Sequence, residues 1–486
     1  MMLKSSTPAA EPNLSNEPPQ DQSFRTHLAA LEKTGDLVRF DKEVDPELNL
    51  SAIEWKTYAE FGKASLFTNI KGHPGWRVCS QIVADRRKWA LGLGIDEDRL
   101  HDEILKRMQS PIPSQLVDAA SAPVKELKLL GADADLRDIP AAIVSDADSG
   151  RYIPSGIAFI KDPETGIGNM SFHRMEVRGK DTTGFAMLPR HALRIYEKYS
   201  KRGEPMPVAV VIGVHPAIWL GSGYTTNFGI DELELAGGIL GASVRTVRCE
   251  TADLNVPADA EMVLEGEIVP GNHLEAEGPF GEVSGTYPVS KKSHVFNLKA
   301  ITRRRDAIYY ALHCGFPDTD TQSTTGLGIE LATREHLQKV DGGLDILDVK
   351  LLTVSGLQAI VVKMRPRIEG EAKTALMAAL TGPYHQPKLA IAVDDDIDVS
   401  DLRQIMWSIA SRVRADRDVI FLPHMKVWAL DAASPLVDGG NGRQRVGTRW
   451  VIDATKGPLT HPDERKKFDK AMPKNFTNVH LSEFLP

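Results

Sequence analysis

The sequence predicts a mixed α/β protein of several domains, and three observations lead to that class. The chain has 486 residues, more than a single hydrophobic core usually organises, so two or three domains are expected. Its 42% hydrophobic and 26% charged residues are typical of a globular protein and exclude a disordered chain, a collagen or a coiled coil. Helix-like and strand-like segments alternate in the two outer parts, whereas strand-like segments dominate the middle.

An N-terminal α/β domain is predicted over residues 24–115. Residues 24–34 have the spacing of a helix and are followed by Gly35, a common helix terminator. The other predicted elements are strands over 37–44, 64–70 and 76–83 and helices over 48–61, 85–93 and 98–108. Residues 1–23 are rich in Pro, Ser and Glu and have no apolar stretch, so we expect a disordered tail there rather than a signal peptide.

The middle of the chain, residues 125–308, is predicted to be rich in β-strands. Residues 110–124 contain three prolines and mark the boundary before it. Predicted strands lie at 156–160, 169–177, 207–214, 243–249, 261–269 and 294–301, with helices at 189–201 and 231–240. Many strands with few helices indicate a β-barrel or sandwich decorated by helices.

A C-terminal α/β domain is predicted over residues 309–456, where helices and strands alternate again. Predicted helices lie at 328–340, 371–380 and 400–414, and predicted strands at 345–354, 357–364, 388–393 and 418–423. The polar residues 457–486 are expected to form a tail or an interface arm.

The net charge, the cysteine spacing and the hydropathy exclude further classes of protein. The 58 Lys and Arg against 66 Asp and Glu give a formal net charge of −8 without a basic block, which argues against nucleic-acid binding. Cys79, Cys249 and Cys314 are spaced too far apart in the sequence to form a disulfide scaffold, which fits a protein of a reducing compartment. The most apolar run, 206–220, falls short of the ~20 residues that a membrane span needs. We therefore expect a cytoplasmic protein that does not enter a membrane.

Familiar nucleotide and calcium motifs do not fit. The sequence has no GxxxxGK[ST], and the glycines of 237–241 lack the GxGxxG spacing, which favours a packing role. The acidic run 394–398 resembles a calcium loop, yet its sixth position is Val399 and its twelfth is Ile405. It is better explained as the end of a strand, with Ser400 capping the next helix.

The strongest candidate chemistry lies in residues 275–287, where Glu277 and Glu282 bracket Gly-Pro-Phe-Gly. Those glycines and the proline prevent a helix, so the chain turns and both carboxylates can converge. Two neighbouring carboxylates repel each other, which keeps a proton on one of them near neutrality, as a general acid requires. The alternative is a solvated acidic turn; the embedded Phe280 argues against it.

A second cluster follows from residues 169–174. In a strand, Asn169 and Ser171 share one face while Arg174 lies on the apolar one and therefore needs a carboxylate partner. Asn169, His191 and Glu232 form a mixed N/O set suited to Mg²⁺ or Mn²⁺ near a phosphate. Taken singly, His191 and Glu232 are also ordinary residues for the first turn of a helix.

The order of these motifs resembles one family. N-x-S-x-x-R, P-x-H, I-D-E-x-x-x-A-G, E-G-P-F-G-E-x-x-G and V-D-D-D-I-D-V occur in sequence from residue 169 to residue 399. Together they are similar to the UbiD family of (de)carboxylases, which use prenylated FMN. The resemblance implies a central split β-barrel that binds the flavin, between an N-terminal α/β domain and a C-terminal α/β domain that carries oligomer contacts.

The resemblance also assigns roles to residues. It implies a catalytic network of Arg174, Glu277 and Glu282, and Mn²⁺ ligands at Asn169, His191 and Glu232. The cofactor contacts that it implies are Asn169, Ser171, Arg174, Arg190, His191, Ser222, Glu232 and Lys388, of which the lysine occurs in some members only. It further implies K⁺ bound by backbone carbonyls of residues 220–224.

The implied reaction is the reversible, non-oxidative decarboxylation of an aromatic, heteroaromatic or α,β-unsaturated acid through a covalent adduct with the cofactor, with Glu282 as the proton donor. By position, Leu327, Trp428 and Leu430 line the substrate pocket, although Trp428 equally suits a plain core. Their apolar bulk favours a flat, uncharged ring and, with leucine at 327, disfavours a phenolic acid. His173, Arg190 and His313 are polar candidates at the rim.

The implied partners are a small-molecule acid, a flavin prenyltransferase that supplies the cofactor, and other copies of the chain in a homodimer or higher oligomer. Two alternatives remain at this point. One is an ordinary FMN-dependent oxidoreductase on a split barrel, which would not need the network of Arg174 with two glutamates. The other is a non-catalytic flavin- or metal-binding subunit.

Overall fold

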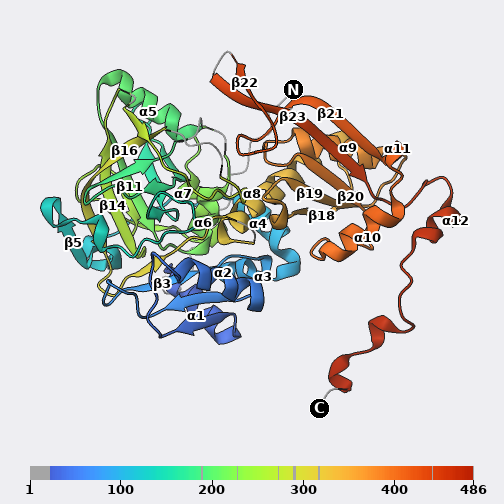
Figure 1. The fold of residues 1–486 in the computed structure, drawn as a ribbon, viewed down its shortest axis with the longest axis horizontal. Coiled ribbons are helices and arrows are strands. Elements are labelled where there is room, and N and C mark those ends of the chain that lie inside the picture. The colour runs from blue at the N-terminus through green and yellow to red at the C-terminus, as the bar shows by residue number, and fades with distance from the viewer. Residues whose placement is uncertain are drawn as a thin grey trace, which may run out of the picture.

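The computed structural model describes residues 22–187, 190–226, 228–271, 273–287, 292–315, 318–439 and 442–484. It confirms the predicted class, a mixed α/β protein in three parts (Figure 1). Most of the predicted N-terminal tail lies outside the described residues; its last two residues, Gln22 and Ser23, are buried. No helix in the described ranges is long and apolar enough to cross a membrane.

The N-terminal part packs helices around a small sheet. Ser23 caps the first helix by accepting from the N–H of Arg25, and Gly35, at φ 74°, ends it as predicted. The elements are α1 (Phe24–Thr34), β1 (Leu37–Phe40), α2 (Leu50–Phe61), β2 (Ala64–Phe67), β3 (Arg77–Ser80), α3 (Arg86–Leu93) and α4 (Leu100–Met108). The sheet order is β1-β2-β3-β17, in which β17 (Ile308–Tyr310) arrives from beyond the central part and pairs in parallel with β3.

The central part is built on one large sheet with the path β10-β16-β14-β11-β7-β8, and its described strands do not close into a ring. Its strands are β5 (Leu127–Leu130), β7 (Ile157–Lys161), β8 (Gly168–Phe172), β10 (Thr182–Phe185), β11 (Met206–Ile212), β14 (Met262–Ile268), β15 (Leu274–Ala276) and β16 (Lys292–Arg303). Smaller sheets pair β6 (Tyr152–Ile153) with β9 (Met175–Glu176), and β12 (Arg245–Arg248) with β4 (Gln115–Leu116) and β13 (Asn255–Pro257). Its helices are α5 (His191–Arg202), α6 (Pro216–Gly223) and α7 (Glu232–Leu240).

Two features of the central part differ from the prediction. The strand predicted over 169–177 breaks after Phe172, so His173 and Arg174 lie in a connection between β8 and β9. Helix α6 was not predicted, because the apolar run conceals it. It begins where Pro216 supplies a preset φ angle and the His215 side chain accepts from the N–H of Ala217.

The C-terminal part has the sheet order β18-β19-β20-β23-β21, with β22 paired to β23. Its elements are α8 (Asp320–Leu337), β18 (Ile346–Leu351), β19 (Ala359–Met364), α9 (Glu371–Thr381), β20 (Leu389–Val393), α10 (Leu402–Arg412), α11 (Ala415–Asp418), β21 (Val419–Lys426), β22 (Leu436–Gly439), β23 (Gly442–Asp453) and α12 (Pro462–Arg465). Asp401, rather than the predicted Ser400, caps α10. Helix α8 starts earlier than predicted because Thr319 and Gln322 form a capping box.

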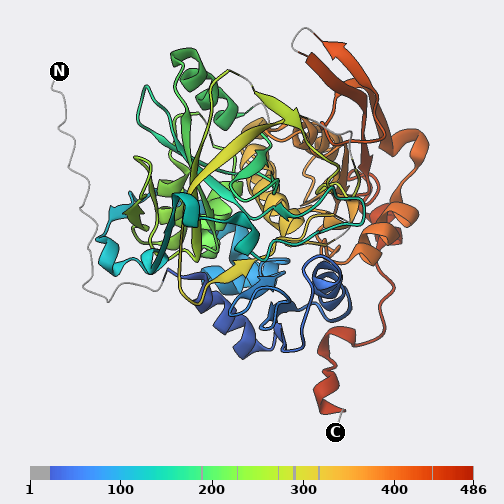
Figure 2. The same ribbon diagram turned by 60° about the vertical axis from the view of Figure 1, so that its left-hand side comes forward.

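Helix α8 joins the three parts (Figures 1 and 2). At its start, Asp320 accepts hydrogen bonds from the backbone N–H groups of Ile82 and Val83 in the N-terminal part. Further along, Glu330 contacts the guanidinium of Arg86 and accepts from the N–H of Leu351 in β18. Buried polar contacts of this kind hold the parts in a defined relation around the centre of the molecule.

Candidate active site

Arg174 and the two predicted glutamates come together. The guanidinium donates from Nε to Oε1 of Glu277 (2.7 Å) and from Nη2 to Oε2 (2.9 Å), and Nη1 contacts Oε1 of Glu282. Both glutamates are buried. Burial alone lowers the pKa of Arg174, but the hydrogen bonds that it donates to Glu277 and the charges of both glutamates outweigh burial and raise that pKa. The cluster therefore carries one fixed positive charge between two carboxyl groups.

A loop at residues 145–149 holds the turn that carries the glutamates. The N–H of Gly281 donates to Oδ1 of Asp148 (2.7 Å), and the N–H of Ser149 donates to the carbonyl of Pro279 (3.0 Å). A Cβ atom at Gly278 would lie 2.0 Å from Cβ of Ser149, closer than any side chain allows. Glycine at this position is thus required for the turn to seat against the loop.

Aromatic packing fixes the middle of the turn. Phe280 is buried in a small cluster with Tyr152 and Cys314, and its ring lies 4.5 Å from that of Tyr152. The guanidinium carbon of Arg174 lies 5.5 Å from the Phe280 ring centre, within the range of a cation–π contact. The buried Phe280 favours a built site over a solvated acidic turn.

Asn169, His191 and Glu232 also come together. Oε2 of Glu232 accepts from Nδ2 of Asn169 (3.0 Å) and from the N–H of Met170 (3.1 Å), while Oε1 lies 3.7 Å from Nδ1 of His191. Thr226, which the sequence did not indicate, donates to Oε1 as well (2.9 Å). Oδ1 of Asn169 is buried and has no hydrogen-bond partner. A buried carbonyl oxygen without a partner suits a cation ligand.

Of Asn169, His191 and Glu232, only the histidine and the glutamate have side chains that are most typical of a metal site. Within the described ranges, no three His, Cys, Asp or Glu side chains are placed to hold one ion. A cation here would therefore be bound through an imidazole, a carboxylate and an amide oxygen. Asn169 and His191 line the same small pocket, together with Gly168, Ile195 and Phe228.

The side chains of the other predicted cofactor contacts form hydrogen bonds within the chain. Ser171 pairs with Nε2 of His173 (2.9 Å), and Ser222 in α6 donates to the carbonyl of Trp219 (2.8 Å). Arg190 precedes α5 and donates to Thr225 (3.1 Å). The ammonium of Lys388 donates to Oδ1 of the buried Asp431 (2.8 Å).

Leu327 faces a different hollow. It lines a cavity of about 160 Å³ whose walls include the charged residues Asp85, Arg86 and Lys350 and exclude Arg174, Glu277 and Glu282. Leu430 is buried, and Trp428 packs on a hydrophobic cluster of the C-terminal part, as expected for a core residue. That the three residues line the substrate pocket stays a prediction.

One buried pair, His313 with Glu54, was not predicted from the sequence. Nδ1 of His313 lies 3.0 Å from Oε1 of Glu54, which comes from α2 in the N-terminal part. His313 was a candidate for the rim, but its carboxylate partner lies more than two hundred residues away in the sequence. The 145–149 loop was missed for the same reason: its contacts with the turn are long-range.

Comparison with known proteins identifies the family. Three family models match consecutive parts of the chain: the N-terminal domain of 3-octaprenyl-4-hydroxybenzoate carboxy-lyase at residues 28–108, its Rift-related domain at 115–317 and its C-terminal domain at 323–454. The chain belongs to the UbiD family. It is a carboxy-lyase, as the sequence predicted.

Individual UbiD relatives match this chain along nearly its whole length. A phenolic acid decarboxylase of Bacillus subtilis (strain 168) is 31% identical over 449 residues, which cover 89% of this chain and 92% of the relative. The UbiD-class enzyme HmfF of Pelotomaculum thermopropionicum in complex with FMN has a TM-score of 0.87 and 32% identity, and covers 95% of this chain and 100% of its own.

Two further UbiD-class structures bear on the reaction. An evolved dimeric form of HmfF was solved in complex with prFMN, with a TM-score of 0.83 and 30% identity over 96% of this chain and all of its own. The 3,4-dihydroxybenzoic acid decarboxylase AroY of Klebsiella pneumoniae, solved without ligand, has a TM-score of 0.85 and 27% identity, and covers 95% of this chain and 99% of its own.

Proposed function

We propose that this UbiD chain is a prenylated-FMN-dependent decarboxylase of an aromatic or related unsaturated carboxylic acid. One observation carries the proposal: the guanidinium of Arg174 lies between the buried carboxyl groups of Glu277 and Glu282. Hydride transfer by an ordinary flavin enzyme has no use for such a network, whereas CO₂ release followed by protonation needs both a cation and an acid.

Arg174, Glu277 and Glu282 have different parts in this reaction. Glu277 holds both Nε and Nη2 and is the more enclosed carboxylate, so it orients the guanidinium. Glu282 contacts Nη1 and is the more exposed of the two carboxylates, which suits it to exchange with a substrate carboxylate on Arg174. A bound carboxylate would add a third negative charge beside a single positive one, which favours Glu282 as the neutral acid. That proton is the one delivered to the substrate carbon after CO₂ leaves.

The residues present fit the cofactor and its metal. Asn169 offers an unpartnered buried oxygen, Glu232 a buried carboxylate and His191 an imidazole, the mixed set that Mn²⁺ accepts beside a phosphate. Arg190 and Lys388 would add positive charge for the phosphate. When bound, prenylated FMN supplies the electron sink for breaking the C–CO₂ bond, through the covalent step with the substrate that the family resemblance implies.

The K⁺ site implied by the resemblance is proposed at the end of α6. The last carbonyl groups of a helix have no partner within it and carry partial negative charge. Residues 221–223 form this end beyond the Leu220 carbonyl, which accepts from the N–H of Tyr224, and a Cβ atom at Gly328 of α8 would approach the Gly223 carbonyl oxygen to 3.3 Å.

The relatives guide the choice of substrate. HmfF binds prFMN, and the B. subtilis relative and AroY act on phenolic and 3,4-dihydroxybenzoic acids. Leu327 is expected to disfavour a phenolic acid, whereas two of the relatives act on phenolic acids, so both hydroxylated and unsubstituted rings are to be tested. We propose an aromatic acid and leave its substituents to experiment.

Co-expression of the chain with a flavin prenyltransferase tests the proposal. The purified protein should contain prenylated FMN by intact cofactor mass and absorption, bind manganese, and release CO₂ from at least one member of a panel of hydroxylated and unsubstituted aromatic acids. Glu282→Gln should abolish CO₂ release and keep the flavin. The matched variant Glu275→Gln, at an exposed glutamate beside the turn, should keep activity. Plain FMN with no CO₂ from any acid would favour an oxidoreductase instead.

A further inference from the structure

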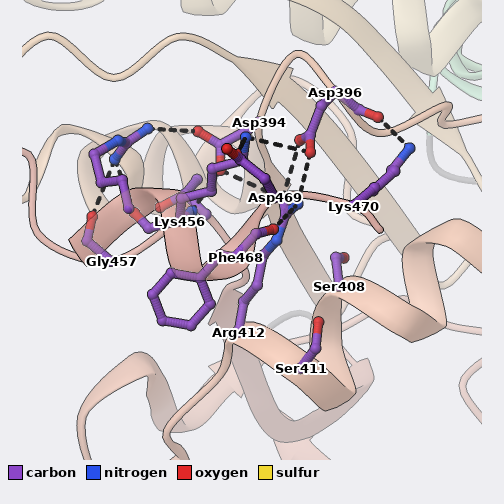
Figure 3. Close-up of polar contacts among 12 residues, drawn as sticks. Asp394, Asp396, Ser408, Ser411, Arg412, Lys456, Gly457, Phe468, Asp469 and Lys470 are labelled. Atoms are coloured by element: carbon purple, nitrogen blue, oxygen red, sulfur yellow. Dashed lines mark hydrogen bonds and ion pairs between the residues drawn. The ribbon is translucent and has the colours of Figure 1, made fainter. Parts of the chain in front are cut away.

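Two buried polar groups outside the proposed catalytic network have different surroundings. In the first, the guanidinium of Arg412 donates to Oδ2 of Asp396 (2.7 Å) and to the carbonyl of Phe468 (3.0 Å), and the charged side chains of this cluster face one another (Figure 3). These contacts hold the segment around Phe468 on the C-terminal part. The second group is the side chain of His173, which precedes Arg174 and whose two ring nitrogens contact a carbonyl and a hydroxyl group.

The ring of His173 is held by contacts with β8 and β10. Its Nδ1 lies 2.8 Å from the carbonyl oxygen of Ala186, which follows β10, and its Nε2 lies 2.9 Å from the hydroxyl oxygen of Ser171 in β8. The ring stacks on that of Phe185, with 4.5 Å between the ring centres. His173 is also buried. Packing and two polar contacts therefore fix the orientation of the ring.

Burial keeps this imidazole neutral. Desolvation lowers the pKa of His173 to about 4 and outweighs the hydrogen bond with the Ala186 carbonyl, which acts in the opposite direction. The charge of His294 on β16 would lower that pKa further, and burial lowers the pKa of His294 as well. At neutral pH, one ring nitrogen of His173 therefore carries a hydrogen and the other carries a lone pair.

The two partners decide which nitrogen carries the hydrogen. A carbonyl oxygen can only accept, so Nδ1 of His173 donates to Ala186. Nε2 is then the acceptor, and the hydroxyl group of Ser171 donates to it. Since a hydroxyl group has a single hydrogen, Ser171 is left with lone pairs for any further contact.

We propose that His173 is a positioning residue that makes Ser171 a hydrogen-bond acceptor toward the bound flavin. The inference rests on the proposed function, in which the cofactor phosphate lies beside the metal group at Asn169. Asn169 and Ser171 share one face of β8, roughly 7 Å apart, and Arg174 follows the strand. A metal-bound phosphate has no hydrogen to donate, whereas the ribityl hydroxyl groups and the ring N–H of a flavin do. Ser171 therefore contacts the flavin beyond its phosphate.

A second route from His173 to the site runs through the backbone. The N–H of Ala186 donates to the carbonyl of Arg174 (3.3 Å), and the N–H of His173 donates to the carbonyl of Gly156 (3.2 Å). If His173 acted by this route, its loss would displace Arg174 whether or not Ser171 has a hydroxyl group. The two routes thus predict different results when both side chains are changed together.

A double-mutant cycle tests the proposal through FMN binding by the full-length, manganese-loaded protein, followed by flavin fluorescence. His173→Phe keeps an aromatic ring beside Phe185 and removes both nitrogens, and Ser171→Ala removes the acceptor. Each should raise the FMN dissociation constant by about 3–10-fold. The double variant should bind FMN as Ser171→Ala does, because the ring acts through the hydroxyl group. The control His73→Phe, at a histidine that contacts the Asp138 carbonyl, should leave binding unchanged.

A conservative replacement and a spectrum separate this role from a loss of packing. His173→Gln offers one N–H donor and one oxygen acceptor, so it should restore FMN affinity to within about threefold of the wild type. In the unchanged protein, nitrogen NMR of ¹⁵N-labelled histidine, assigned by the signals that His173→Gln removes, should show hydrogen on Nδ1 alone at pH 7. Hydrogen on Nε2 would overturn the proposal even if the phenylalanine variant does not fold.

The outcomes also separate this inference from the proposed function. Additive effects in the cycle, or unchanged FMN affinity in His173→Phe, would overturn the role of His173 while the chain remains a flavin-binding protein. A glutamine variant as weak as the phenylalanine variant would do the same. A wild type that does not bind FMN would refute the proposed function, and this inference with it.

Discussion

Arg174 and Glu277 form a buried two-point pair, with Nε and Nη2 of the guanidinium bonded to the two oxygens of one carboxylate at 2.7 and 2.9 Å. Glu282 contacts the remaining Nη1 and is the more exposed of the two carboxylates. This asymmetry separates two glutamates that look equivalent in the sequence. The two-point pair fixes the orientation of the guanidinium, and in the proposed reaction the less enclosed Glu282 is the one that exchanges with the substrate.

Arg174→Lys tests the need for that geometry. Lysine keeps the positive charge but cannot make the planar fork, so the carboxylates lose their shared orientation. We expect kcat/KM for the aromatic acid to fall by about 10²–10³-fold while bound flavin is retained. Arg248→Lys, at an exposed strand position, is the control. A change of less than threefold at position 174 would contradict the assigned role.

Gly278→Ala tests how the turn is seated. The added Cβ atom would lie 2.0 Å from Cβ of Ser149, so the turn or the loop must move. We expect the free energy of unfolding to drop by about 1–3 kcal/mol and kcat to drop with it, because Glu277 is displaced. Gly150→Ala, at the residue that follows the 145–149 loop, is the matched control, since nothing lies within 4 Å of its new Cβ atom. Equal behaviour of the two variants would count against a tightly seated turn.

Asn169→Ala tests the proposed metal site. It removes the buried oxygen that has no hydrogen-bond partner and the contact to Glu232. Manganese affinity, measured by metal analysis after dialysis, should fall by about tenfold or more, and bound flavin should fall with it. The exposed Asn255 provides the control Asn255→Ala. Unchanged manganese content in Asn169→Ala would exclude this residue as a ligand.

The buried Asp320 predicts a pH dependence of stability. Burial raises its pKa to about 6, against hydrogen bonds from Tyr310 and from the N–H of Val83 that act in the opposite direction. Because the folded state holds this proton more tightly than the unfolded state, Asp320 favours folding at about pH 4. The full contribution, about 3 kcal/mol, is present below the unfolded-state pKa of about 4 and is lost as the pH rises through about 6.

Urea unfolding of the wild type and of Asp320→Asn between pH 4 and pH 7 measures this effect. The stability of the asparagine variant relative to the wild type should increase by about 2 kcal/mol over that range. Asp98→Asn, at an exposed position, should show no such trend. A difference that does not vary with pH would mean that the Asp320 carboxyl ionises alike in the folded and unfolded states.

Local patterns predicted much of the fold, because helix ends and strands are set by near neighbours. Gly35 ended a helix where expected, and both predicted side-chain groups, at Arg174 and at Glu232, come together. The break after Phe172 was not predictable from alternation, since residues 169–177 keep a strand pattern throughout. Likewise the apolar run that conceals α6 has no helical periodicity to detect.

Long-range pairings account for the rest of what was missed. Strand β17 joins the sheet of the N-terminal part through pairs such as Tyr310 with Cys79, a choice that depends on the whole topology. Gly278 packs against Ser149, and His313 pairs with Glu54; in both cases the partner lies far away in the sequence. Such contacts follow from the packing of the domains, which no local propensity encodes.

The ammonium of Lys388 already has a carboxylate partner in the structure, so replacing this lysine should lower stability. It donates to Asp431 at 2.8 Å, and the side chain of Asp431 is almost fully buried. Lys388→Met would leave that carboxylate without its cation, although Ser434 and the N–H of Ala433 still donate to it. We expect the free energy of unfolding to fall by about 2 kcal/mol, less than for a fully enclosed pair, because Lys388 is partly exposed.

The double variant Lys388→Met/Asp431→Asn separates this structural role from the proposed contact with the cofactor phosphate. Asparagine removes the lone buried charge, so most of the lost stability should return. If Lys388 also holds the phosphate, both variants should still bind flavin about tenfold more weakly than the wild type, as measured by flavin retention on dilution. Recovery of flavin binding together with stability would show that Lys388 acts through Asp431 alone.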